Sequence, residues 1–112
     1  MAIRMNKPWS PLTKSGINRL AGHMGVYQLG DAQGNVLYIG IADGRSRFGL
    51  RGELERVLAA PPQGAVQYRD EVNTAYATRW QELLMVYVAD FGTLPMHNPA
   101  RDGVNLGRLS PA

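Results

Sequence analysis

Two tyrosines in matching tripeptides are the residues of this chain best suited to chemistry. Gly25-Val26-Tyr27 is separated by ten residues from Tyr38-Ile39-Gly40. A phenol both donates and accepts a hydrogen bond, and with an ordinary pKa of about 10 it keeps its proton at neutral pH unless neighbours favour the phenolate. Catalysis by these tyrosines therefore needs a nearby cation. The alternative interpretation is a hydrophobic hairpin in which both rings are core aromatics.

A single carboxylate, Glu82, stands in a predicted helix that is otherwise poor in charge. From residue 74 to residue 91 the only other charged residues are Arg79 and Asp90. At about 100° per residue, Glu82 lies nearly opposite the apolar stripe of this helix. Taken from the residues alone, an i,i+3 ion pair with Arg79 on a partly exposed face explains it.

Arginine supplies most of the positive charge. Of the twelve basic residues only Lys7 and Lys14 are lysines, the formal net charge is +3 and the sequence pI is about 9.6. The planar arginine fork suits bidentate phosphate contacts, so this composition favours a polyanionic partner. Arg45 and Arg47 lie in a loop rich in glycine and arginine, and Arg51 follows in the first turn of a predicted helix. The alternative is that all three are surface charges.

A β-hairpin over residues 25–40 is expected to position the tyrosines. Turn-forming residues occupy positions 30–35 between two runs of apolar β-formers. Symmetric pairing about this turn places Tyr27 opposite Tyr38 and Gly25 opposite Gly40. The phenols would then lie side by side on one face of the sheet. The two glycines would leave the strand ends bare, so that a bulky ligand can approach the backbone.

Three further elements follow the hairpin. Apolar residues at helical spacing predict a helix over residues 48–59, which a pair of prolines ends. Alternation predicts a strand over residues 65–72, and a second long helix runs from Thr74, its expected N-cap, to Phe91. The predicted fold class is therefore α+β: a small, mostly antiparallel three-stranded sheet in the order β-hairpin, helix, strand, helix, covered by helices.

The rest of the chain frames one domain over residues 1–112. Residues 1–23 form an N-terminal arm with a short helix over residues 13–20, and Trp9 is expected to pack back onto the body. Residues 99–112 form an irregular tail. The sequence has no cysteine, no apolar stretch of membrane-spanning length and no secretory signal, so a cytoplasmic protein without a membrane partner is expected.

The paired tripeptides are similar to the signature of the GIY-YIG nuclease superfamily. The resemblance covers residues 25–98, which would form the catalytic core. It includes the order of the predicted elements, Glu82 in the second helix, and the later Pro95 and Asn98, which resemble the family's Pro-x-x-Asn segment. The resemblance implies a GIY-YIG-like fold and a nuclease activity.

The resemblance also implies a role for each catalytic residue. Tyr27 would take a proton from the attacking water, Tyr38 would position that water, and Arg51 would bind the phosphate. Glu82 would be the single protein ligand of a catalytic Mg²⁺, with Mn²⁺ as the alternative ion, because one carboxylate with several retained waters is normal for magnesium. The expected products carry a 5′-phosphate and a 3′-hydroxyl.

Two departures from the family pattern affect these assignments. The helix arginine of the family stands sooner after the second tripeptide than Arg51 does, so Arg47 is the alternative for that role. Ile41 stands where several members carry a basic residue. Asn98 is expected to brace the backbone behind Glu82 rather than to react. The residues assigned to substrate binding are Gly25, Gly40, Arg45, Arg47 and Asn98.

Three functions remain open at this point. The first is a metal-dependent endonuclease that hydrolyses phosphodiester bonds in DNA, with RNA as an alternative substrate. The second is a nucleic-acid-binding domain on the same scaffold that cuts poorly or not at all, as Ile41 and the displaced arginine suggest. The third is an interaction module whose tyrosine face is core. Specificity would come from DNA shape, from a partner protein or from a homodimer.

Overall fold

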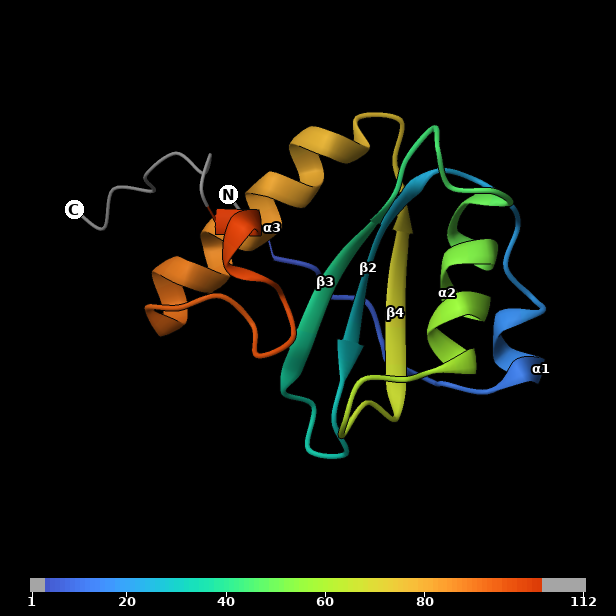
Figure 1. Cartoon of the computed structure of the whole chain (residues 1–112), viewed down its shortest axis with the longest axis horizontal. Coiled ribbons are helices and arrows are strands. Elements are labelled where there is room, and N and C mark those ends of the chain that lie inside the picture. The colour runs from blue at the N-terminus through green and yellow to red at the C-terminus, as the bar shows by residue number, and fades with distance from the viewer. Residues whose placement is uncertain (1–3, 104–112) are drawn as a thin grey trace.

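The protein is built around a four-stranded antiparallel sheet with helices on both faces (Figure 1). The structure, a computed structural model, describes residues 4–103. Strands β2 (Gly25–Gly30), β3 (Val36–Ala42) and β4 (Gln67–Val72) form the body of the sheet, with β2 between the other two. The two-residue β1 (Ser10–Pro11) pairs with the outer edge of β4. It adds a fourth strand to the three predicted, because two residues carry no alternation pattern.

The helices lie in two separate layers. In Figure 1, α2 (Gly49–Ala59) and the short α1 (Lys14–Ile17) lie beside one face of the sheet, and α3 (Tyr76–Phe91) lies beside the other. A 3₁₀ turn, η1 (Ala100–Gly103), follows α3. The α+β class and the predicted order of hairpin, helix, strand and helix are confirmed. Within residues 4–103, none of the helices has the length and apolar character needed to cross a bilayer.

The ends of α3 show which local signals were interpreted correctly. Gly92 adopts a φ of 77° and its N–H bonds to the Val88 carbonyl at 2.7 Å, so it ends the helix as expected. The prediction of Thr74 as N-cap is wrong. The helix begins two residues later, and the Asn73 side chain accepts from the Ala75 N–H at 2.8 Å.

The hairpin register differs from the symmetric prediction. Tyr27 pairs with Gly40 and Leu29 pairs with Tyr38, whereas Gly25 pairs with Ala42. A bulge between Leu29 and Gly30 shifts the pairing. Because the shift along the body of the hairpin is two residues, every side chain keeps its expected face. The two tyrosines are therefore diagonal neighbours on one face rather than direct partners.

Alternating residues of the strands separate two hydrophobic cores. Tyr27 and Leu29 point to the side of α2, where they pack with Leu50, Leu54 and other apolar residues. Val26 and Ile39 point to the side of α3, where Leu83 and Leu84 cover them. Since neighbouring residues of a strand face opposite ways, the sheet itself divides the molecule into a face under α2 and a face under α3.

The N-terminal arm packs back onto the body as expected. The Trp9 ring lies against Gly30, where even a Cβ would stand 2.6 Å from it, and the Arg69 guanidinium lies 4.2 Å from its centroid. The short helix in the arm covers Lys14–Ile17, with Thr13 as its N-cap. Residues 1–3 of the predicted arm and residues 104–112 of the predicted tail lie outside the described residues.

Candidate functional site

Tyr27 and Tyr38 meet under α2. Their ring centroids are 6.0 Å apart and the rings are tilted by 46°. Tyr27 is fully buried and Tyr38 is half-buried. The Tyr27 ring occupies the space over its strand partner Gly40, where a Cβ would lie 2.2 Å from the ring carbon Cζ. Gly40 is therefore needed for packing of this tyrosine.

The glycines at the strand ends do not leave the open space that was predicted. A Cβ on Gly25 would meet the Glu71 carbonyl oxygen at 2.1 Å, and a Cβ on Gly40 would overlap Tyr27. Protein atoms occupy both positions, so the expectation of bare backbone for a ligand is wrong. At Gly40 the physical reason is the shifted register, which brings an aromatic ring rather than a second glycine opposite it, and at Gly25 it is the neighbouring strand β4.

A carboxylate that the sequence reasoning missed joins the tyrosines. Glu53 of α2 accepts hydrogen bonds from the Tyr27 hydroxyl at 3.4 Å, from the Ser46 hydroxyl at 3.3 Å and from Arg56 Nη2 at 2.9 Å. We call these five residues the tyrosine cluster: Tyr27, Tyr38, Ser46, Glu53 and Arg56.

A signal for Glu53 does exist in the sequence. Glu53 lies three residues after Leu50 and four before Val57, both of which are buried on the inner face of α2. An acid within the apolar stripe of a helix needs a partner inside the protein. Arg56 pairs with Glu53 at 2.9 Å while 66 % of its side chain stays exposed, so it is a surface charge with an acidic partner.

The environment of both phenols favours the protonated form. Burial raises the pKa of Tyr27 far above its ordinary range, and the charges of Tyr38 and Glu53 add to this effect. Burial also raises the pKa of Tyr38, together with the charge of Asp102. Phenolate was expected to be favoured by a nearby cation, and the direction is the opposite because desolvation outweighs the charge of Arg56. A neutral, buried phenol is a poor general base.

Arg51 and Arg47 lie outside this cluster. Arg51 is exposed in the first turn of α2, where its Nε lies 3.8 Å from Glu55 in an i,i+4 pair. Arg47 is exposed, with its guanidinium 5.3 Å from the centroid of the Phe48 ring. The arginine that contacts the tyrosine cluster is therefore Arg56 rather than either predicted residue.

Glu82 is on the other side of the sheet from the tyrosines. It belongs to α3, and its carboxylate pairs with Arg79 as the i,i+3 interpretation predicts. Arg79 also holds both oxygens of Glu71, at 2.9 and 3.2 Å. Tyr27 and Tyr38 face α2. The structure thus does not bring Tyr27, Tyr38, Arg51 and Glu82 to one place.

The residues present do not fit a magnesium ion shared by Glu82 and the tyrosines. The Glu82 carboxylate is engaged by Arg79, and the sheet separates it from both phenols. Residues 4–103 also contain no group of three or more His, Asp or Glu side chains placed to hold a metal. The geometry therefore does not support one ion that is bound by Glu82 and also adjoins both phenols.

Asn98 braces the backbone of the edge strand. Its Oδ1 accepts from the Ile39 N–H at 2.9 Å, and its Nδ2 donates to the Ile39 carbonyl at 3.0 Å and to Asp102 at 2.9 Å. Trp80 Nε1 donates to the same Ile39 carbonyl at 3.0 Å. The expected bracing role is thus seen, at β3 rather than behind Glu82. The Asn98 amide thus makes the two backbone hydrogen bonds that a neighbouring strand would make, and it covers this part of the sheet edge.

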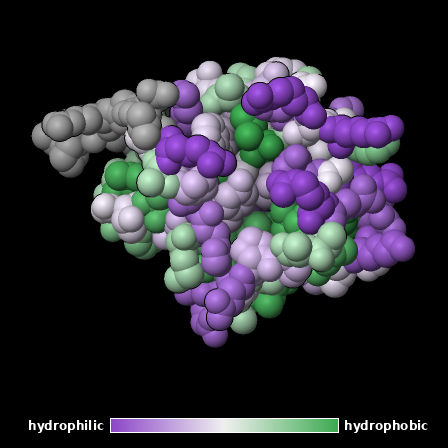
Figure 2. All heavy atoms as spheres, viewed as in Figure 1, coloured by the Kyte–Doolittle hydropathy of each residue, from purple (hydrophilic) through white to green (hydrophobic). Residues whose placement is uncertain are grey.

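The loop before α2 presents an exposed basic and aromatic surface. The Arg45 side chain is 93 % exposed and only loosely paired with Asp43, at 3.4 Å. Phe48 is 64 % exposed and has a φ of 64°, a left-handed conformation that is unfavourable for a bulky residue. We call Arg45, Arg47, Phe48 and Arg51 the loop surface. Figure 2 shows hydrophilic side chains gathered over this end of the molecule.

Comparisons with known proteins identify a family but no activity. No curated protein and no solved structure matches the chain. A family model matches residues 3–90, which contain the strands and α-helices seen in the described part of the chain, except the last residue of α3. The chain belongs to the family described as a domain of unknown function, DUF7508.

Proposed function

We propose that this protein binds nucleic acid through the loop surface, on a scaffold of the GIY-YIG type, and that it cuts phosphodiester bonds poorly or not at all. One observation carries the proposal: Phe48 is an exposed aromatic ring held in a strained backbone conformation between exposed arginines. Strained residues that the surrounding structure maintains occur preferentially at functional sites.

The packing of the loop explains how this strain is maintained. A Cβ on Gly52 would lie 1.9 Å from the Arg47 carbonyl oxygen, and Gly49, with a φ of 57°, packs against the backbone of Gly22 and His23. Gly52 lets the loop lie directly on the first turn of α2, and Gly49 lets the N-terminal arm approach the same turn. The backbone at Phe48 is thereby held in place before any ligand binds, which lowers the entropy lost on binding.

The chemistry of the loop surface suits single-stranded nucleic acid. Bases stack on exposed aromatic rings with little regard to sequence, and arginines contact the adjoining phosphates. The surface holds one such ring and three arginines, two of which are only weakly paired with acids at 3.4 and 3.8 Å. Binding is thus expected to depend on salt and not on base sequence.

Fluorescence anisotropy with a labelled 20-nucleotide DNA tests the proposal. If three arginines each contact a phosphate, affinity for a single strand falls roughly 20-fold between 50 and 200 mM NaCl. Phe48→Ala should weaken binding about tenfold through lost stacking. Arg47→Ala should weaken it at every sequence tested and reduce the salt dependence. Arg101→Ala is the matched control, since Arg101 is also exposed but lies in η1. Equal losses in the Arg101 and Arg47 variants would contradict the proposal.

Cleavage of DNA is a second candidate, and the tyrosine cluster is the observation in its favour. Two phenols and a carboxylate share one face, and the two tyrosines belong to the tripeptides that resemble the GIY-YIG signature. A plasmid-nicking assay with Mg²⁺ separates the possibilities. Nicking that Tyr38→Phe and Glu53→Gln abolish but Glu82→Gln leaves intact would support chemistry at the tyrosine cluster. Nicking lost in Glu82→Gln would support the site that the sequence resemblance implies. Binding without nicking supports the first proposal.

A further inference from the structure

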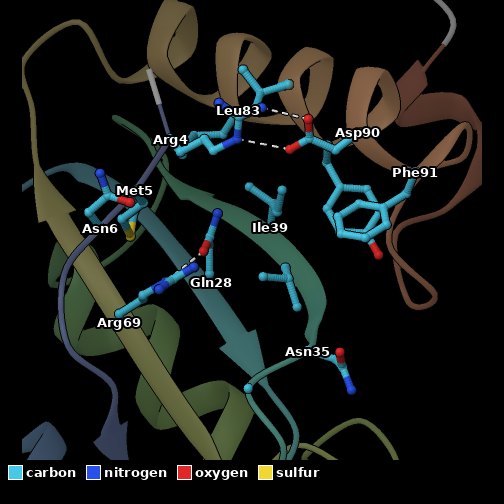
Figure 3. A pocket seen from close by; sticks show the side chains of 14 residues that line it. Arg4, Met5, Asn6, Gln28, Asn35, Ile39, Arg69, Leu83, Asp90 and Phe91 are labelled. Atoms are coloured by element: carbon cyan, nitrogen blue, oxygen red, sulfur yellow. Dashed lines mark hydrogen bonds and ion pairs between the residues drawn. The ribbon is translucent and has the colours of Figure 1, made fainter. Parts of the chain in front are cut away.

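A pocket on the α3 face is separate from every residue discussed as a nucleic-acid or catalytic contact. It has a volume of about 320 Å³ and lies between α3, the N-terminal arm and the sheet. Figure 3 shows Gln28 in its centre, Arg69 beside it, and the Arg4–Asp90 pair on the side of α3. This volume lies within the range of small-molecule sites in proteins.

Arg69 gives the pocket a positive charge that no acid neutralises. Its Nε donates to Gln28 Oε1 at 2.7 Å and its Nη1 donates to the Lys7 carbonyl at 3.3 Å, and both acceptors are uncharged. Within residues 4–103 no carboxylate lies within ion-pair distance of it, whereas Arg4 and Arg56 each hold one and Arg79 holds two. The Trp9 ring lies over one face of the guanidinium, 4.2 Å from it, but a ring carries no net charge. This half-buried cation therefore lacks a counter-ion among the described residues, and an anionic ligand would supply one.

Gln28 offers a second group for the same ligand. The residue is 5 % exposed, and its Oε1 is used by Arg69. Its Nε2 donates to none of the described residues, yet no side-chain N or O atom in that part of the chain is both fully buried and unpartnered. The amide therefore keeps access to the pocket. An amide N–H₂ beside an arginine fork forms a pair of donors suited to a carboxylate.

The rest of the lining defines the body of the ligand. Arg4 and Asp90 neutralise each other through two hydrogen bonds, at 2.9 and 2.6 Å, so the pocket keeps one net positive charge. Its accessible apolar walls come from Val36, Tyr87 and Phe91. One positive charge beside an apolar cavity matches a monoanion that carries a hydrophobic or aromatic group.

We propose that this pocket binds a small organic carboxylate, with the carboxylate held by Arg69 and Gln28 and an apolar or aromatic body held against Val36 and Tyr87. The site goes beyond the proposed nucleic-acid function and does not depend on it. The loop surface lies in the loop before α2 and in the first turn of that helix, whereas this pocket lies under α3 on the opposite face of the sheet.

Titration of the full chain with 3-phenylpropionate, followed by ¹H–¹⁵N NMR, tests the proposal. We expect saturable shifts of the Gln28 side-chain amide and of the Arg69 Nε–H. The neutral isostere 3-phenylpropanamide should bind at least tenfold more weakly, because the arginine prefers an ionised acceptor. Equal affinity for the acid and the amide, or shifts that lie away from these two side chains, would overturn the proposal.

Gln28→Glu is the decisive variant because it places a carboxylate of the same shape beside Arg69. The new acid should take the place of the ligand, so that affinity for 3-phenylpropionate falls at least tenfold while the fold is retained. Gln63→Glu is the matched control, since it makes the same charge change at an exposed position outside the pocket. It should change affinity less than twofold. Unchanged binding in Gln28→Glu, with native circular dichroism, would refute the site.

Discussion

The two faces of the sheet use their polar residues in opposite ways. Under α2, the hydroxyls of Tyr27 and Ser46 and the guanidinium of Arg56 all bond to one carboxylate, Glu53. Under α3, the Arg69 guanidinium bonds only to uncharged oxygens and borders an open pocket. Of the two tyrosines that look reactive in the sequence, Tyr27 thus has its hydroxyl bonded inside the protein. Arg69, whose guanidinium has an aromatic ring but no carboxylate as a partner, belongs to none of the motifs seen in the sequence.

The largest expected effect comes from breaking the tyrosine face at Gly40. A methyl group there would lie 2.2 Å from Tyr27 Cζ, and Tyr27 is fully buried with no room to move. We expect Gly40→Ala to lower the free energy of unfolding by about 3 kcal/mol. Gly44→Ala is the control, because the nearest atom to its new Cβ, the Tyr76 hydroxyl oxygen, is 4.0 Å away. Urea denaturation measures both. A Gly40→Ala protein as stable as the control would show that the ring does not occupy this space.

Removing the Asn98 side chain, which braces the edge strand β3, should have the next largest effect. Strand β3 carries residues of both faces of the sheet, Tyr38 toward α2 and Ile39 toward α3. Asn98→Ala leaves the Ile39 N–H without its acceptor, whereas the Ile39 carbonyl keeps its bond from Trp80. An unpaired buried amide costs about 2 kcal/mol. Urea denaturation should show this loss, and hydrogen exchange at the Ile39 amide should become faster. Unchanged exchange at Ile39 would contradict the role assigned to Asn98.

Alkaline pH should weaken the tyrosine face selectively. The pKa of Tyr27 is raised in the folded state, mainly by burial, so the folded protein keeps this proton more tightly than the unfolded chain does. The contribution is complete below about pH 10 and is lost as pH rises further, by about 1.4 kcal/mol per pH unit. The free energy of unfolding, measured by denaturation between pH 8 and 11.5, should show this slope. Tyr27→Phe should reduce the slope by the contribution of one titrating group. The same slope in Tyr27→Phe would mean that other tyrosines carry it.

The sequence predicted the elements well because their signals are local. The helix over 49–59 follows from its apolar spacing, and the end of α3 follows from Gly92. The hairpin register could not be predicted because it depends on the bulge beside Gly30 and on the turn. In that turn the Asp31 side chain accepts from the N–H groups of Gln33 and Asn35, both at 2.9 Å. A turn of this kind shifts the pairing without changing the face of any residue.

The sequence predicts the candidate site only to the extent that strand alternation determines which face of the sheet a side chain lies on. Alternation alone places Tyr27 and Tyr38 on one face, and the structure agrees. Whether Glu82 reaches them depends on which side of the sheet α3 crosses, and no residue of α3 encodes that by itself. The location of Glu82 on α3 was predicted, and its convergence with the phenols was not supported. Tertiary packing of two helices on opposite faces decides between the two outcomes.

The smallest expected effect, at Glu82, tests most directly whether the two faces are independent. Arg79 stays paired with Glu71 when the Glu82 charge is removed, and the Glu82 side chain is 39 % exposed. Glu82→Gln should therefore change the free energy of unfolding by only about 0.3 kcal/mol. The resonances of Tyr27 and Tyr38 should not move, because the sheet lies between them and the substitution. A shift of either tyrosine resonance in this variant would mean that the faces are coupled, and it would restore Glu82 as a partner of the phenols.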